Sequence, residues 1–75
     1  MKKGFERMAV CGSCARQLDR GKTVGGALES AKNYVSKGSL DNAKQEYNFA
    51  LRVLKESGGC SSCIREIIRL QNMNT

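Results

Sequence analysis

The sequence of 75 residues contains no proline, no histidine and no tryptophan, and its aromatic residues are two tyrosines and two phenylalanines. Because proline is absent, the glycines are the main positions at which helical structure can be interrupted. Because histidine, a serine-centred motif and paired carboxylates are also absent, the sequence offers no acid–base or nucleophilic machinery. We therefore expect a protein that is not an enzyme.

Long apolar runs are missing as well. No stretch approaches the roughly 20 apolar residues of a transmembrane helix. The N-terminus lacks the apolar stretch and the cleavage site of a signal peptide. The apolar run of residues 8–10 is too short for a signal peptide or a transmembrane helix. We therefore expect no membrane association and a cytoplasmic location, where thiols stay reduced.

The short length makes a stable core difficult to build. The chain is expected to form one domain, residues 1–75, and a small domain buries a smaller share of its surface than a large one. Domains of roughly 70 to 80 residues or fewer commonly add disulfides, a metal ion or a partner subunit. The four cysteines are the candidates for this additional stabilisation.

Positive charge is in excess. Thirteen lysines and arginines against seven acidic residues give a formal charge of +6, and residues 1–22 hold six basic and two acidic side chains. This surface keeps a small protein soluble, and it also attracts anionic partners. If nucleic acid is the partner, the candidate contacts are the basic residues of this arm and two from the last segment: Lys2, Lys3, Arg7, Arg16, Arg20, Lys22, Arg65 and Arg69.

Glycines divide the chain into four segments in which apolar residues recur at steps of three and four, the spacing of a helix. The first predicted helix covers about residues 5–20, with a possible break or fresh start at Gly12 and Ser13. The others cover about 24–37, 40–57 and 60–73. Thr23 and Ser39 are candidate N-caps, and Gly38 is the expected stop of the second helix.

The short connection at Gly38 and Ser39 predicts that the second and third helices fold back as an antiparallel hairpin. Alternation typical of strands is missing throughout. We therefore predict an all-α fold, a small bundle of about four helices with a central antiparallel hairpin. The N- and C-terminal helices are expected to be cross-linked through their cysteines.

The central segment, residues 24–57, resembles a tetratricopeptide repeat. The residues that carry the resemblance are Ala27, Ala31, Tyr34, Gly38, Leu40, Ala43, Tyr47 and Ala50. The resemblance implies a helical hairpin with a concave protein-binding face, but not an array, since arrays need about three or more repeats. An ordinary antiparallel helix pair, or a three-helix domain of the microtubule-interacting and trafficking type, is consistent with the same pattern.

Two Cys-x-x-Cys pairs carry the strongest functional signal. Cys11 and Cys14 form Cys-Gly-Ser-Cys, and Cys60 and Cys63 form Cys-Ser-Ser-Cys. Two thiols three residues apart at a helix start can point at one ion, and four thiolates complete a tetrahedral zinc site. The 45 residues between the pairs exceed the spacer of roughly 15 to 20 in a zinc ribbon. The sequence therefore favours one structural zinc bound between helices.

Three other arrangements of the same cysteines stay open. Two inter-helix disulfides are geometrically plausible but require an oxidising environment. An iron–sulfur cluster also uses four cysteines, although the typical ferredoxin spacing is absent. Dithiol redox catalysis has the Cys-Gly-Ser-Cys motif in its favour, but no βαβ pattern surrounds it.

The favoured function is a non-catalytic protein-interaction module that is stabilised by a four-cysteine zinc site. The module is expected to present the surface around residues 24–57 to a protein partner. The partner can also be a second copy of the chain, which would make a homo-oligomer. The alternatives are a basic nucleic-acid-binding accessory protein and a disulfide-linked or thiol-redox helical protein.

Overall fold

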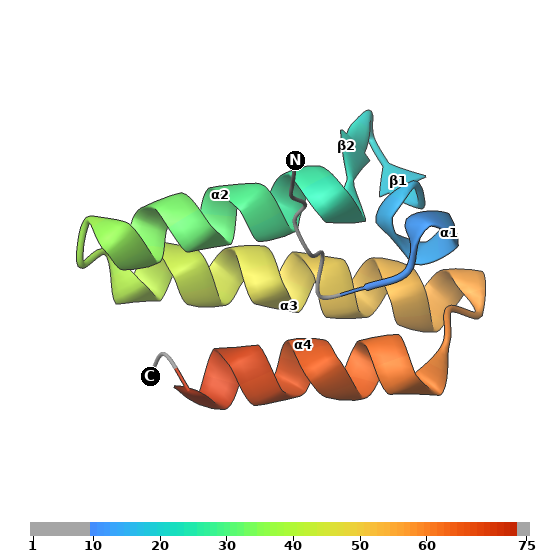
Figure 1. Ribbon diagram of the computed structural model, residues 1–75. Helices are drawn as coiled ribbons and strands as arrows, with labels where there is room; N and C mark the ends of the chain where they lie inside the picture. The colour runs from blue at the N-terminus through green and yellow to red at the C-terminus, as the bar shows by residue number, and fades with distance from the viewer. Residues whose placement is uncertain (1–9, 74–75) are drawn as a thin grey trace, which may run out of the picture.

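The computed structural model describes residues 10–73, and helices dominate this part of the chain (Figure 1). The helices are α1 (Gly12–Ala15), α2 (Val24–Ser36), α3 (Leu40–Ser57) and α4 (Ser61–Met73). Two short strands, β1 (Leu18–Asp19) and β2 (Lys22–Thr23), lie between α1 and α2. The all-α prediction is confirmed, with a small β ribbon added.

The predicted central hairpin is formed by α2 and α3. The side-chain oxygen of Thr23 accepts a hydrogen bond from the amide of Gly26 at 2.9 Å, which caps the first turn of α2. After α2 the chain reverses at Gly38, whose φ of 79° lies in the left-handed region that favours glycine. Ser39 precedes α3 but makes no capping side-chain hydrogen bond.

Small side chains lie where α2 packs against α3. Ala27 and Ala31 of α2 and Ala43 and Ala50 of α3 are all buried. The distance between packed helices depends on the side chains at their contact, so alanines allow a close approach. Tyr47 is buried in the same core.

Helix α4 packs against the other side of α3, so that α3 lies between α2 and α4 (Figure 1). Ile67 of α4 and Leu54 of α3 are completely buried. Ile68, the next residue of α4, is 38% exposed, because successive helical residues point about 100° apart and only one of the two isoleucines can face α3. Within residues 10–73, no helix combines the length and the apolar character that crossing a bilayer requires.

The prediction of one helix over residues 5–20 is wrong in its described part, although a helix does start at Gly12, one of the two positions given for a fresh start. Helix α1 has only four residues, and the following β1 and β2 pair in antiparallel register, Leu18 with Thr23 and Asp19 with Lys22. Arg20 and Gly21 join them with φ values of 56° and 79°. Positive φ at both central residues is the geometry of a type I′ hairpin turn. Residues 5–9 lie outside the described residues.

Two glycines, Gly58 and Gly59, connect α3 to the second cysteine pair. Gly58 ends the helix with φ 76°, and a side chain built on Gly59 would place its Cβ 2.8 Å from Cδ2 and 3.0 Å from Cβ of Leu54. Gly59 thus lets the backbone pass directly over a buried leucine before Cys60. A larger residue has to displace Leu54 or the chain that carries Cys60.

We expect Gly59→Ala to lower the free energy of unfolding by about 1 to 3 kcal/mol, the usual cost of overpacking a core. Gly12→Ala is the matched control, because a Cβ built there has no atom within 4 Å beyond its chain neighbours and the backbone of its own helix, and its φ is not positive. Chemical denaturation of both variants in excess zinc measures the difference. Equal stability of the two variants would contradict the close packing described for Gly59.

Candidate metal centre

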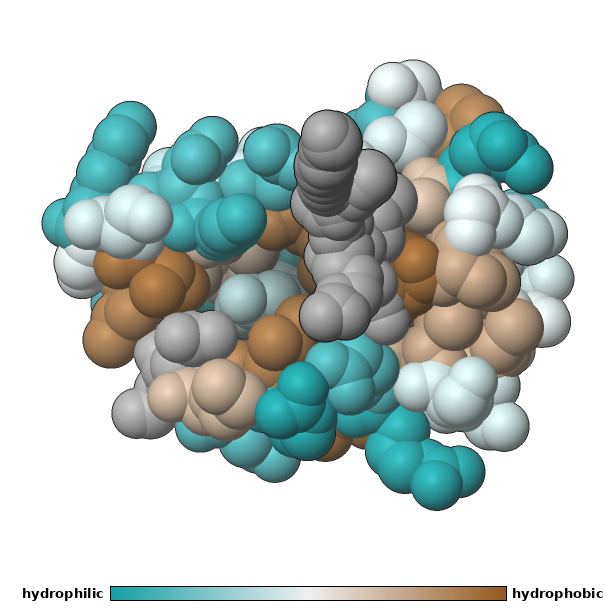
Figure 2. Space-filling view, in the orientation of Figure 1, coloured by the Kyte–Doolittle hydropathy of each residue, from teal (hydrophilic) through white to brown (hydrophobic). Residues whose placement is uncertain are grey.

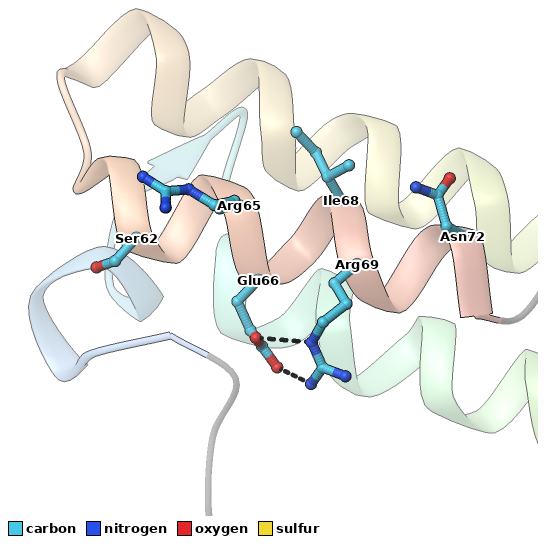
Figure 3. A pocket seen from close by; sticks show the side chains of 6 residues that line it. All are labelled: Ser62, Arg65, Glu66, Ile68, Arg69 and Asn72. Atoms are coloured by element: carbon cyan, nitrogen blue, oxygen red, sulfur yellow. Dashed lines mark hydrogen bonds and ion pairs between the residues drawn. The ribbon is translucent and has the colours of Figure 1, made fainter.

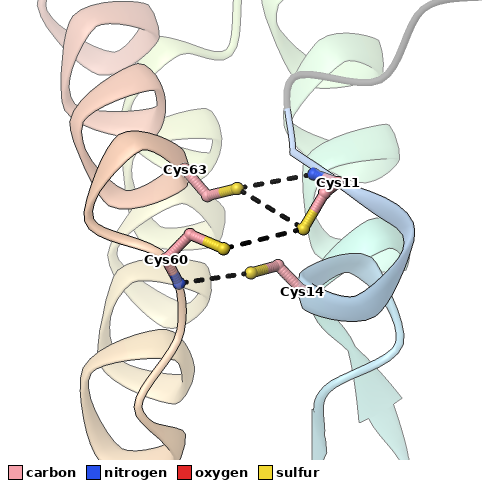
Figure 4. Close-up of side chains that lie close together, drawn as sticks. All are labelled: Cys11, Cys14, Cys60 and Cys63. Atoms are coloured by element: carbon pink, nitrogen blue, oxygen red, sulfur yellow. Dashed lines mark hydrogen bonds between the residues drawn. The ribbon is translucent and has the colours of Figure 1, made fainter.

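The four cysteines meet at the end of the molecule where α4 begins (Figure 4). Cys11 is the N-cap residue of α1, and Cys14 lies within that short helix. Cys60 directly precedes α4, and Cys63 lies in its first turn. Each pair therefore occupies a helix start, with its first cysteine exposed and its second buried. This confirms the predicted meeting of the two pairs.

The distances between the sulfur atoms suit a single ion. All four Sγ atoms lie within 4.8 Å of one another, and Cys11 Sγ lies 3.8 Å from both Cys60 Sγ and Cys63 Sγ. Four sulfurs at about 2.3 Å from a tetrahedral zinc are about 3.8 Å apart. The arrangement fits one tetrahedrally bound metal ion.

The same distances can be compared with those expected for disulfides and for an iron–sulfur cluster. The four cysteines are free, and 3.8 Å is far longer than the S–S bond of about 2.05 Å, so the predicted disulfide alternative is not found. An iron–sulfur cluster inserts several irons and sulfides among its cysteines, which holds the thiolates further apart than ligands of one ion. The spacing therefore favours a mononuclear site.

Backbone amides connect the two pairs across the site. The amide of Cys11 donates to Cys63 Sγ at 3.4 Å, and the amide of Cys60 donates to Cys14 Sγ at 3.5 Å. In each case the first cysteine of one pair donates to the second cysteine of the other pair. These reciprocal hydrogen bonds stabilise negative charge on the two buried sulfurs, as expected for groups that serve as thiolate ligands.

Mutual proximity separates the pKa values of the thiols. The amide of Cys14, with the neighbouring thiols, lowers the pKa of Cys11 to about 7. Hydrogen bonds with Cys14 and Cys11, together with the negative charge of Cys11, raise the pKa of Cys60 to about 12. The amide of Cys11 lowers the pKa of Cys63, but burial and the neighbouring thiols outweigh it, so the net change is upward. A cation bound among the sulfurs would favour their ionised form.

We expect the affinity for zinc to fall steeply on acidification. A metal-bound thiolate holds no proton, whereas the metal-free thiols take up protons as the pH falls, so metal-dependent stability is present at high pH and lost at low pH. Each thiol that must lose its proton weakens binding by about tenfold per pH unit, and the dependence steepens below the pKa of about 7 for Cys11. Chelator competition at several pH values measures the slope; an affinity independent of pH would contradict thiolate ligation.

Contacts of the β ribbon with α3 hold the first cysteine pair in place. Asp19 accepts a hydrogen bond from Arg52 at 3.2 Å, and Lys22 Nζ lies 2.5 Å from Glu46 Oε1. The charge of Lys22 also lies 5.0 Å from the ring centre of Phe49 on α3. These contacts join the residues after α1 to the middle helix. Sequence reasoning missed them, because the partners are 24 or more positions apart and neither strand carries an alternating pattern.

Five of the eight predicted nucleic-acid residues lie within the described part of the chain. Lys2, Lys3 and Arg7 lie outside the described residues. Lys22 is paired with Glu46, and Arg69 donates two hydrogen bonds to the carboxylate of Glu66, which raises the pKa of Arg69 and lowers that of Glu66. The other three candidates, Arg16, Arg20 and Arg65, are exposed.

A shallow hollow lies on the outer face of α4 (Figure 3). Exposed Ile68 contributes the apolar part, and the bidentate pair of Arg69 with Glu66 forms one side. Its complete lining is Ser62, Arg65, Glu66, Ile68, Arg69 and Asn72. Two arginines and one glutamate leave the hollow with a single net positive charge.

Comparisons of the chain with protein-family models, curated proteins and solved structures gave no match.

Proposed function

We propose that this chain is a small non-catalytic interaction module whose helical fold is held together by one zinc ion bound to Cys11, Cys14, Cys60 and Cys63. The observation that carries the proposal is the cluster of four sulfur atoms within 4.8 Å, drawn from opposite ends of the chain. Zinc is favoured over other divalent ions because soft thiolates in a tetrahedral set suit it.

A structural role for the zinc is supported by the completeness of its ligand set. Catalytic zinc sites keep one position open for water or substrate, whereas four cysteines fill all four positions. The buried sulfurs of Cys14 and Cys63 belong to the same core as Val24 and Leu54. A metal held by these cysteines would therefore cross-link the core of a chain that is small for independent stability.

The test is a zinc titration of the reduced, chelator-treated protein, followed by circular dichroism and native mass spectrometry. We expect helical signal to rise and saturate at one zinc per chain. The double variant Ser13→Ala, Ser62→Ala is the matched control, because it changes the exposed spacer of each pair and keeps all four ligands. Full helicity without metal would contradict a structural role.

A protein partner is supported by the hollow on α4. Ile68 offers an apolar contact next to the exposed guanidinium of Arg65, while Arg69 is already paired with Glu66. A single net positive charge is weak for binding a phosphate backbone, but it suits a protein segment that carries an acidic residue beside an apolar one. The tetratricopeptide-like resemblance of residues 24–57 stays a prediction.

We expect a photo-crosslinking residue at position 68 to capture a defined protein in cells that express the chain, because Ile68 lies in the hollow. The same residue at position 32 is the matched control, since Lys32 is exposed on α2 away from the hollow. Capture of nucleic acid, of no macromolecule, or of the same proteins at both positions would contradict this part of the proposal. Self-capture would identify a homo-oligomer.

A further inference from the structure

The four ligands of the proposed zinc site differ in their access to solvent. Cys14 and Cys63 are buried, at 3% and 6% exposure, and each sulfur accepts an amide hydrogen bond from the other pair. Cys11 and Cys60 are exposed, and their sulfurs lie 3.8 Å apart (Figure 4). One edge of the site therefore faces solvent, while the opposite edge is within the core.

Small residues separate the two cysteines of each pair. The spacers of the two pairs are Gly12, Ser13, Ser61 and Ser62, and all four are exposed. None has a side chain long enough to cover a neighbouring sulfur. In the space-filling view, moderately hydrophobic residues reach the surface at the end where α1 lies (Figure 2). Within residues 10–73, these short spacers leave the edge open to a small polar oxidant.

We propose that the exposed sulfurs of Cys11 and Cys60 form a peroxide-reactive modification site, at which oxidation to a disulfide releases the metal. This inference rests on the zinc site proposed above and adds its regulation. Thiolate character and exposure set the reactivity of cysteine towards oxidants, and a second nearby cysteine converts the first product into a disulfide.

The reaction with hydrogen peroxide has two steps. The Cys11 thiolate attacks one peroxide oxygen, the O–O bond breaks, and the departing hydroxide takes a proton to become water. Cys60 then attacks Cys11 Sγ, the S–O bond of the sulfenic acid breaks, and a second hydroxide leaves and is protonated. Two thiolates are oxidised by two electrons, one peroxide is reduced to two waters, and Zn²⁺ leaves the two remaining thiolates.

Cys60 is a better resolving partner for Cys11 than Cys63, although both sulfurs lie 3.8 Å away. Cys60 precedes α4 and is exposed, so its side chain can rotate into solvent. Cys63 is fixed inside the helix, is buried, and its sulfur accepts the Cys11 amide. The resulting disulfide still joins α1 to the start of α4, so metal is released while the two ends of the chain stay linked.

The experiment treats the zinc-loaded protein with hydrogen peroxide in the presence of a colorimetric zinc chelator. Free thiols are then alkylated and the peptides are identified by mass spectrometry. We expect release of one zinc per chain, a Cys11–Cys60 disulfide, and alkylation confined to Cys14 and Cys63. Met73→Leu is the matched control, since the exposed Met73 is also open to oxidation and its removal is expected to leave the release rate unchanged.

The outcomes separate the two proposals. Protein that holds no zinc before oxidation contradicts the metal site itself. Zinc that stays bound while methionines are oxidised, or that leaves with a disulfide containing Cys14 or Cys63, contradicts only the inference about the exposed pair.

Discussion

Replacing Cys14 with serine is expected to abolish the cooperative thermal unfolding of the chain in excess zinc and reductant. The variant loses one of the four proposed ligands, and zinc binding supplies about 10 to 16 kcal/mol in structural sites of small domains. The whole stability of a domain is only about 5 to 15 kcal/mol. The buried position of Cys14 and its hydrogen bond from the Cys60 amide at 3.5 Å increase the loss.

Circular dichroism melting curves of the Cys14→Ser variant provide the measurement. Ser13→Ala is the matched control, because Ser13 is exposed and lies between the two ligands of the same pair. We expect the control to melt like the parent protein, and a strong chelator to reproduce the effect of Cys14→Ser in the parent. An unchanged melting temperature in Cys14→Ser would contradict a structural site.

The second large effect is expected for Leu54→Ala. Leu54 is completely buried in α3, and its side chain lies against the backbone of Gly59, one residue before the second cysteine pair. Truncating a buried leucine usually costs about 2 to 5 kcal/mol, because apolar contacts are lost and a cavity remains. In a domain of this size, such a loss lowers the melting temperature by at least about 8 °C.

Urea denaturation of zinc-loaded Leu54→Ala measures this loss. Lys55→Ala is the control, since Lys55 is the next residue on the same helix and is exposed. We expect its free energy of unfolding to change by less than about 0.5 kcal/mol, as for most surface substitutions. An equally small change for Leu54→Ala would contradict the proposal that packing of Leu54 against Gly59 stabilises the turn before Cys60.

The long helices were predictable because their signals are local. Glycines and apolar spacing predicted helices over residues 24–37, 40–57 and 60–73, and the structure has them at Val24–Ser36, Leu40–Ser57 and Ser61–Met73. Thr23 caps its helix as predicted. The buried face of α4 is harder to predict, because adjacent isoleucines at 67 and 68 do not indicate which of them turns towards α3.

The first segment shows why short elements escape sequence analysis. A two-residue strand cannot display alternation, and apolar residues at helical steps outweighed the turn at Arg20 and Gly21. The meeting of the two cysteine pairs was predictable from their chemistry. Two features were not predictable, because they depend on contacts between distant parts of the chain. One is which cysteines are buried. The other is the pairing of Asp19 and Lys22 of the β ribbon with residues of α3.

Metal content is the most direct test of the central claim. Protein purified in reductant is analysed for zinc and iron, and X-ray absorption at the metal edge then gives the ligands. We expect one zinc per chain with four sulfur neighbours at about 2.3 Å. Reduced, folded protein with no metal, or with a metal bound by fewer than four sulfurs, would contradict it.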